Sequence, residues 1–123
     1  MVDIFKVLAD ENRLRILNLL RKDELCVCEI EAILDTTQSN VSRHLTRLRN
    51  DKLVSFEKRA QWIYYSLHPE FIKDHRLLFD YLVHEMEQNE AYQADEKRLA
   101  AYRASSLTCE TVTQINLSEA LRK

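Results

Sequence analysis

The chain contains no glycine. At average usage a chain of this length would hold about eight glycines. Without them the chain cannot form a Walker A loop, a G-x-G-x-x-G dinucleotide turn or a G-x-S-x-G nucleophile elbow. These absences exclude most nucleotide-dependent enzymes and hydrolases. Because hairpins and sheets depend on glycine turns more than helices do, the sequence predicts a mainly α-helical protein.

Length and composition indicate one soluble domain. The 123 residues are 46% hydrophobic and 31% charged, and a chain of this size should bury roughly two-thirds of its unfolded surface. Residues 1–104 are expected to form the domain. Residues 105–123 are expected to form a C-terminal tail, in which a flexible chain and one last helical turn are both open. With no signal-peptide pattern and no run of about 18 apolar residues, we expect a cytoplasmic protein without a membrane partner.

The charge of the chain is unevenly distributed. The net charge is −2, but residues 36–68 carry +4 and the segments on either side carry −3 each. A sequence pI of about 6.1 therefore does not argue against nucleic acid as a partner, because the positive charge is gathered in the middle third.

Apolar residues at helical spacing predict a series of short helices. Two flank a join near Asp10, a third covers residues 27–34, and a fourth begins near Gln38 after the capping residues Asp35-Thr36-Thr37. The last two, joined by a turn of about three residues, have the form of a helix-turn-helix. The inner face of the fourth helix would consist of Val41, Leu45 and Leu48.

Strand-forming residues follow from Leu53 and predict a β-hairpin with a basic tip. Its turn lacks glycine and asparagine, so a loop longer than two residues is expected. Pro69 then suits the first turn of a helix whose apolar stripe continues to Met86 for about five turns, and a polar helix covers residues 90–103. The predicted fold is mainly α, a winged helix-turn-helix with a β-hairpin wing and terminal dimerisation helices.

This order of elements predicts contacts with double-stranded DNA. The helix from Gln38 would enter the major groove, and the basic hairpin tip would reach the neighbouring backbone. The predicted DNA-binding residues are Gln38, Ser39, Asn40, Ser42, Arg43 and Arg47 on the helix, with Lys58, Arg59 and Gln61 on the wing. Trp62, Tyr64 and Tyr65 are expected to pack in the hairpin and the core instead of stacking on bases.

The long apolar stripe also predicts a homodimer. The stripe from Phe71 to Met86, together with Ile4, Phe5 and Leu8, would leave a larger apolar surface than a monomer normally exposes.

Three runs of the sequence resemble the arsenical-resistance repressor (ArsR/SmtB) family of bacterial metalloregulators. They are FKVLADENRLRILNLL, ELCVCEIEAILDTTQSNVSRHLTRLRNDKLV and QWIYYSL. ELCVCEIE is similar to the signature of the arsenite-sensing branch. The resemblance implies a homodimeric repressor that binds its operator without ligand and leaves it when a trivalent metalloid or metal binds.

Two departures from the family pattern bear on the ligand. The arsenite-sensing branch has a third cysteine where this chain has Glu31. The branch that senses zinc or cobalt has a D-x-H-x10-H-x2-E pattern, and His75, His84 and Glu87 do not fit it. His44 is expected to be packed or to face phosphate, not to bind metal.

Cys26 and Cys28 are the predicted ligands for As(III) or Sb(III), with no organic cofactor, since thiolates are soft ligands. On an intact helix their side chains would point roughly 200° apart. Binding would then need a frayed helix start or an unwound first turn. The third position on the ion is open among Cys109 of the same chain or of the dimer mate, a small external thiol, and the carbon of a mono-organic arsenical.

Two other functions remain open. One is a repressor that senses thiol oxidation, and the other is a winged-helix protein-interaction module that does not bind DNA. An enzyme is not expected, because no set of nucleophile, base and orienting group is apparent. The missing glycines also require other residues to make two turns, residues 50–52 and 59–61, and Asn50 is expected to adopt a left-handed conformation.

Overall fold

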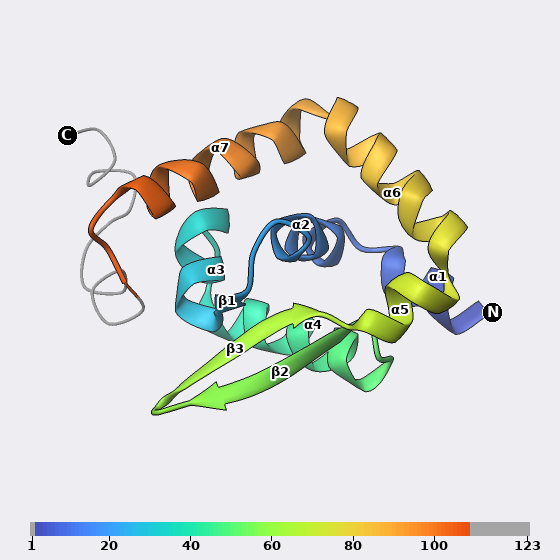
Figure 1. The fold of residues 1–123 in the computed structure, drawn as a ribbon, viewed down its shortest axis with the longest axis horizontal. Helices are drawn as coiled ribbons and strands as arrows, with labels where there is room; N and C mark the ends of the chain where they lie inside the picture. The colour runs from blue at the N-terminus through green and yellow to red at the C-terminus, as the bar shows by residue number, and fades with distance from the viewer. Residues whose placement is uncertain (1, 109–123) are drawn as a thin grey trace.

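Helices account for most of the computed structural model, which describes residues 2–108 (Figure 1). The helices are α1 (Val2–Leu8), α2 (Glu11–Leu20), α3 (Val27–Leu34), α4 (Gln38–Asn50), α5 (Pro69–Asp74), α6 (Arg76–Gln88) and α7 (Glu90–Ala104). The strands are β1 (Leu25–Cys26), β2 (Val54–Arg59) and β3 (Trp62–Leu67). The predicted mainly α, winged helix-turn-helix fold is confirmed.

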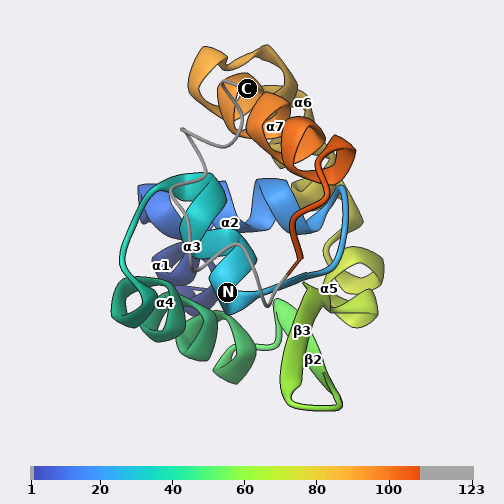
Figure 2. The ribbon, with the colours of Figure 1, turned by 90° about the vertical axis from the view of Figure 1, so that its left-hand side faces the viewer.

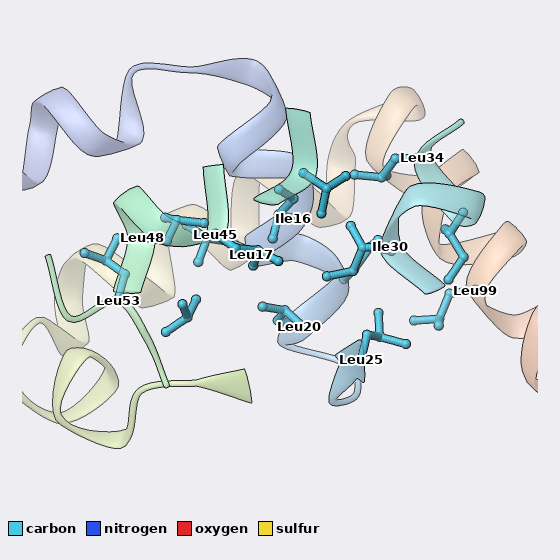
Figure 3. Packing of buried hydrophobic residues seen from close by; sticks show 14 of the residues in the cluster. Ile16, Leu17, Leu20, Leu25, Ile30, Leu34, Leu45, Leu48, Leu53 and Leu99 are labelled. Atoms are coloured by element: carbon cyan, nitrogen blue, oxygen red, sulfur yellow. The ribbon is translucent and has the colours of Figure 1, made fainter. Parts of the chain in front are cut away.

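Helix α2 lies at the centre of the fold, and its apolar side chains form the middle of the core (Figure 3). The helix begins after Asp10, whose side chain accepts a hydrogen bond of 3.1 Å from the backbone N–H of Arg13. Asp10, at the predicted join between the first two helices, is thus the N-cap of α2. Ile16, Leu17, Leu19 and Leu20 are all buried.

Helices α3 and α4 form the helix-turn-helix. Helix α3 ends at Leu34, and the C-cap residue Asp35 takes the left-handed conformation with φ 54°. Thr37 then caps α4 by accepting a hydrogen bond of 3.2 Å from the backbone N–H of Asn40. The predicted inner face of α4 is confirmed, since Val41, Leu45 and Leu48 are all at most 1% exposed.

The three strands form an antiparallel sheet in the order β1-β3-β2. Arg59 pairs with Trp62, so the wing turns through two residues and the expectation of a longer loop is wrong. Ala60 makes this tight turn possible by taking φ 56° without glycine. The two-residue strand β1 was not predicted, because its only signal is its pairing with Tyr64 and Tyr65 of β3.

The prediction that Asn50 is left-handed is wrong. Asn50 is the last residue of α4, and Lys52 takes the positive φ of 63°. The backbone N–H of Leu53 donates to the carbonyl of Leu48 at 2.9 Å, and that of Lys52 donates to the carbonyl of Arg49 at 3.0 Å. This is the Schellman arrangement, and it folds Leu53 back onto Leu48 in the core.

The helix predicted to follow Pro69 without interruption is broken at His75, where φ is −123° and ψ is 42°. The break separates two parts with different surroundings. Phe71 of α5 is buried in the core, whereas Leu77 and Tyr81 of α6 are 88% and 60% exposed.

Helix α7 packs across α2 and α3 (Figures 1 and 2). Tyr92, Leu99 and Tyr102 are buried, and the carboxylate of Asp95 accepts two hydrogen bonds of 2.8 Å from Arg15. Helix α7 thus packs against the same core as α2 and α3. Within residues 2–108, every helix is too short or too polar to cross a membrane.

Candidate cysteine site and DNA interface

Cys26 and Cys28 bring their sulfur atoms to 3.4 Å from each other. Cys26 is the N-cap of α3 and has an extended backbone with φ −90° and ψ 169°, while Cys28 lies in the first turn. The prediction required a frayed helix start or an unwound first turn for the sulfurs to meet. Neither is needed in the structure, because α3 begins at Val27 and only Cys28 of the two cysteines is helical. Two cysteine sulfurs therefore lie side by side next to an intact helix.

The two cysteines differ in exposure. Cys26 is 2% exposed and Cys28 is half-buried. Burial raises the pKa of the Cys28 thiol, and the nearby carboxylates of Glu29 and Glu31 raise it further. At neutral pH Cys28 is therefore protonated, and a thiophilic ligand must displace its proton.

The cysteine pair opens into a cavity of about 430 Å³. The walls come from the start of α3, the first residue of α4 and the tip of the wing. Among the described residues the lining is Cys26, Val27, Cys28, Glu31, Gln38, Gln61, Trp62 and Ile63. The fold thus brings together the predicted ligand residues Cys26 and Cys28 with the predicted DNA-contacting residues Gln38 and Gln61.

The outer face of α4 carries the remaining helix residues predicted to contact DNA. Ser39, Arg43 and Arg47 are exposed, and Asn40 and Ser42 are half-buried. Arg43 donates to the Asn40 side chain at 2.7 Å, and Arg47 donates to Asp51 at 2.8 Å. Helix α4 and the hairpin lie on the same side of the molecule, opposite α7 (Figures 1 and 2).

In the wing, Lys58 is exposed but Arg59 is held by acidic side chains. The guanidinium of Arg59 binds both carboxylate oxygens of Glu24, one of them at 3.0 Å, and Glu57 at 3.1 Å. The hydrogen bond from Arg59 lowers the pKa of Glu24. The wing is thus attached to the residue that precedes β1. Glu24 was not predicted as a site residue, because its neighbour lies 35 positions away.

His44 is buried on the inner face of α4, at 1% exposure. Its Nδ1 atom lies 3.3 Å from Arg13 Nη1, and its Nε2 atom has no hydrogen-bond partner among the described residues. Burial lowers the pKa of His44. Residues 2–108 contain no group of three or more His, Cys, Asp or Glu side chains placed to hold a metal ion, and Cys109 lies outside the described residues.

Comparison with known proteins identifies the family. Residues 10–55 match the model of the arsR family of bacterial regulatory proteins. The fold matches reduced HlyU from Vibrio cholerae with a TM-score of 0.57 at 40% sequence identity, over 66% of this chain and 85% of that one. The chain belongs to the arsR family. The sequence resemblance to this family is confirmed.

Relatives of this arsR-family chain include proteins named for arsenic resistance. The arsenic resistance transcriptional regulator ArsR1 of Pseudomonas putida is 46% identical over 68 residues, which are 54% of this chain and 53% of the relative. The arsenical resistance operon repressor of Escherichia coli is 45% identical over 69 residues, which are 55% of this chain and 59% of the relative. The matches thus span little more than half the length of these relatives.

A structural neighbour bears on assembly. Mb0332 from Mycobacterium bovis, a possible ArsR-family regulator described as a homodimeric winged helix-turn-helix DNA-binding domain, matches with a TM-score of 0.59 at 26% identity, over 68% of this chain and 78% of that one. The family and its members are transcriptional regulators, not enzymes, which confirms the prediction that this chain is not an enzyme.

Proposed function

We propose that this arsR-family protein is a transcriptional repressor that leaves its operator when As(III) or Sb(III) binds the thiolates of Cys26 and Cys28. The observation that carries the proposal is the shared cavity. The paired sulfurs open onto a space that is also walled by Gln38 of α4 and Gln61 of the wing. A ligand on the sulfurs would therefore touch both elements that face DNA.

The DNA-facing surface is the outer side of α4 and the wing. The N-terminal residues of α4 would meet base edges in the major groove, while the wing would follow the adjacent backbone. The positive charge of residues 36–68 supplies the attraction to phosphate. The ion pair between Arg47 and Asp51 does not oppose this role, since exposed pairs contribute only about 0–1 kcal/mol and Arg47 can exchange its partner for phosphate.

The spacing of the two sulfurs suits a single thiophilic ion. Metal–sulfur bonds of about 2.3 Å that meet at roughly 90–110° place two sulfurs about 3.3–3.8 Å apart. The 3.4 Å between Cys26 and Cys28 falls in this range. With arsenous acid, two S–As bonds form, each thiol gives its proton to a hydroxyl on arsenic, and two water molecules leave. The third arsenic position then keeps its hydroxyl, or Cys109 or an external thiol displaces that hydroxyl as a third water molecule. In a mono-organic arsenical the third position is already occupied by carbon.

Ligand binding at this place would reach the DNA-facing elements by two routes. Cys26 pairs with Tyr64 of β3, and Glu24, two residues before Cys26, holds Arg59 of the wing. Helix α3 in turn packs against α4. A displacement of the α3 N-terminus would therefore change the spacing between the recognition helix and the wing, and DNA binding depends on that spacing.

The homodimer would form through the outward faces of α1 and α6. Phe71, Leu8 and Met86, which the sequence assigned to the dimer stripe, are buried within one chain. The apolar side chains left exposed near this end of the molecule are Val2 (65%), Phe5 (53%), Leu77 (88%) and Tyr81 (60%). A second copy of the chain would cover them, and Mb0332, similar in fold, is described as homodimeric.

Two other ligand chemistries fit the same cysteine pair. Cadmium is thiophilic, and the relatives include the cadmium resistance regulator CadC of Listeria innocua, 41% identical over 75 residues. Peroxide would oxidise two thiols this close to a disulfide, with two electrons and two protons passing to the peroxide to give water. The second candidate function is therefore a repressor that senses thiol oxidation.

The deciding experiment measures release from DNA with each ligand in parallel. A duplex selected from random sequences by the full-length protein is labelled, and its binding is followed by fluorescence anisotropy. Arsenite, antimonite, a phenylarsenical, cadmium, zinc and peroxide are then added separately. We expect arsenite and antimonite to release the wild-type protein but not the Cys26→Ser or Cys28→Ser variant. Trp62, the only tryptophan in the chain, lines the cavity and reports occupancy by its emission.

The same experiment separates the alternatives. Release of the two serine variants by arsenite would refute the proposed site. Release by peroxide alone, reversed by a thiol reductant, would establish the oxidation sensor, and release by cadmium alone would establish a cadmium sensor. An absence of any salt-sensitive DNA affinity would indicate a protein-interaction module. Cys109→Ser serves as the third arm, and an unchanged arsenite affinity would remove Cys109 from the site.

A further inference from the structure

Helix α7 contacts both ends of the helix that carries the cysteine pair. At the N-terminus of α3, the hydroxyl of Tyr102 donates to Glu29 Oε2. At its C-terminus, Arg98 donates to the backbone carbonyls of Ile33 at 2.7 Å and Ala32 at 3.2 Å. Figure 1 shows α7 running past α3 on the side away from α4.

The carboxylate of Glu29 connects Cys26 directly to α7. Its Oε1 atom accepts a hydrogen bond of 3.0 Å from the backbone N–H of Cys26, and its Oε2 atom accepts from Tyr102. Glu29 is 3% exposed, and Arg103 Nη1 lies 3.6 Å from Oε2. A buried carboxylate with these partners fixes the first turn of α3, because moving that turn would leave the charge without its donors.

Helix α7 is itself held firmly to the centre of the fold. Asp95 accepts two hydrogen bonds from Arg15 of α2, and Arg21, which follows α2, donates to Glu96 at 2.8 Å. The side chain of Asn18 donates to the backbone carbonyl of Tyr92 at 3.3 Å. Helix α7 therefore holds α3 in a fixed position relative to α2, against which α4 also packs. It lies outside residues 10–55, the part that matches the family model.

We propose that α7 is a brace that stabilises the DNA-binding position of α3, with Tyr102 as the positioning residue that acts on the cysteine pair through Glu29. The inference rests on the proposed function, because it concerns how readily the bound ligand displaces α3 from its DNA-binding position. Suppose that the protein has two states and is mostly in the DNA-binding one. Destabilising that state by a given factor raises the small population of the released state by the same factor, while the population of the DNA-binding state hardly changes.

This reasoning gives the Tyr102→Phe variant a distinctive signature. The variant loses one hydrogen bond to a charged group, which corresponds to about a tenfold or larger change in an equilibrium constant. Arsenite affinity, measured by Trp62 emission, should therefore rise about tenfold. DNA affinity without ligand should stay within about twofold of wild type. A residue that only supports the fold would instead weaken both.

Tyr92→Phe is the matched control. Tyr92 is a second buried tyrosine on α7, but its hydroxyl interacts with Glu11 of α2 and not with α3. We expect its arsenite affinity to match that of wild type. Arg98→Met, which removes the contacts at the other end of α3 and keeps the aliphatic stem, should repeat the effect of Tyr102→Phe and provides a second test if that variant does not fold.

The outcomes can be told apart when thermal unfolding is recorded for each variant. The brace would be refuted if arsenite releases the wild-type protein from DNA but the folded Tyr102→Phe or Arg98→Met variant has an unchanged or lower arsenite affinity. The same rise in Tyr92→Phe would overturn it too, since the effect would then be a general loosening of α7. A wild-type protein that no thiophilic ligand releases would refute the proposed function itself.

Discussion

Arg59 at the end of strand β2 is bound to Glu24, which lies two residues before Cys26. The wing and the cysteine segment are therefore joined by a side-chain ion pair as well as by the pairing of β1 with β3. The pair is exposed and contributes little to the stability of the fold. Its proposed effect is on DNA binding, because Arg59 held by Glu24 is less available to phosphate.

The Glu24→Gln variant should bind DNA more tightly. Removing this carboxylate frees Arg59 for phosphate and deletes one negative charge near the duplex. The slope of log affinity against log salt concentration should become steeper by about one. Anisotropy titrations at several salt concentrations would measure both. Glu85→Gln, the same charge change on α6, should leave the slope as it is, and weaker binding by Glu24→Gln would show that the wing needs the ion pair.

Reversal of the two arginines on the outer face of α4 should abolish specific binding. In the Arg43→Glu, Arg47→Glu double variant two attractive charges become repulsive, so affinity should fall by more than 100-fold and its salt dependence should flatten. Lys97→Glu, which reverses one exposed positive charge on α7, is the control and should leave binding largely intact. Intact DNA binding by the double variant, checked with the same duplex, would exclude α4 as the recognition helix.

Leu77→Glu should prevent formation of the proposed homodimer. Leu77 is 88% exposed on α6, so the substitution has little effect on a single folded chain but places a charge in the proposed interface. Sedimentation analysis would give the mass directly. Ile63→Glu alters an exposed apolar residue of the wing and should leave the mass unchanged. A Leu77→Glu protein with the wild-type mass would mean that another face forms the dimer.

The stability of the protein should fall as the pH drops below about 6.5. Burial lowers the pKa of His44, an effect reinforced by Arg43 and Arg13 and opposed by Asp10. Below this pH His44 binds a proton more readily in the unfolded chain than in the folded chain, so acid favours unfolding. The contribution is at most about 1.4 kcal/mol per pH unit for one proton.

The His44→Gln variant tests this assignment. Urea unfolding between pH 5.5 and pH 7.5 should show a smaller pH dependence for His44→Gln than for wild type, whereas His84→Gln, on the exposed side of α6, should keep the wild-type dependence. Equal slopes in all three proteins would assign the acid sensitivity to other groups.

The sequence allowed the helices to be placed well wherever a cap and a periodic apolar face coincide. Asp10 and Thr37 cap the helices that begin after them, and the inner face of α4 follows from Val41, Leu45 and Leu48. Features that depend on distant partners could not be predicted in this way. Strand β1 exists only through its pairing with β3. The burial of Tyr102 depends on its contact with Glu29 of α3, which lies 73 positions earlier in the chain.

The cysteine geometry was mispredicted for a local reason. The 200° separation applies only when both cysteines are helical, but α3 begins at Val27, as the sequence predicts, so Cys26 lies just before the helix and its side chain takes another direction. An N-cap residue is extended, so its side chain turns back toward the first helical turn. The boundary of a helix is the least certain part of a sequence prediction, and here the proposed ligand site lies at that boundary.

Asp35, Lys52 and Ala60 hold left-handed conformations that glycine adopts without penalty. Each costs a side-chain-bearing residue roughly 1–2 kcal/mol. The chain thus has three positions at which it could be made more heat-resistant without altering the cysteine pair or the outer face of α4. Ala60→Gly and Lys52→Gly would be natural starting substitutions for a more heat-resistant form of this protein.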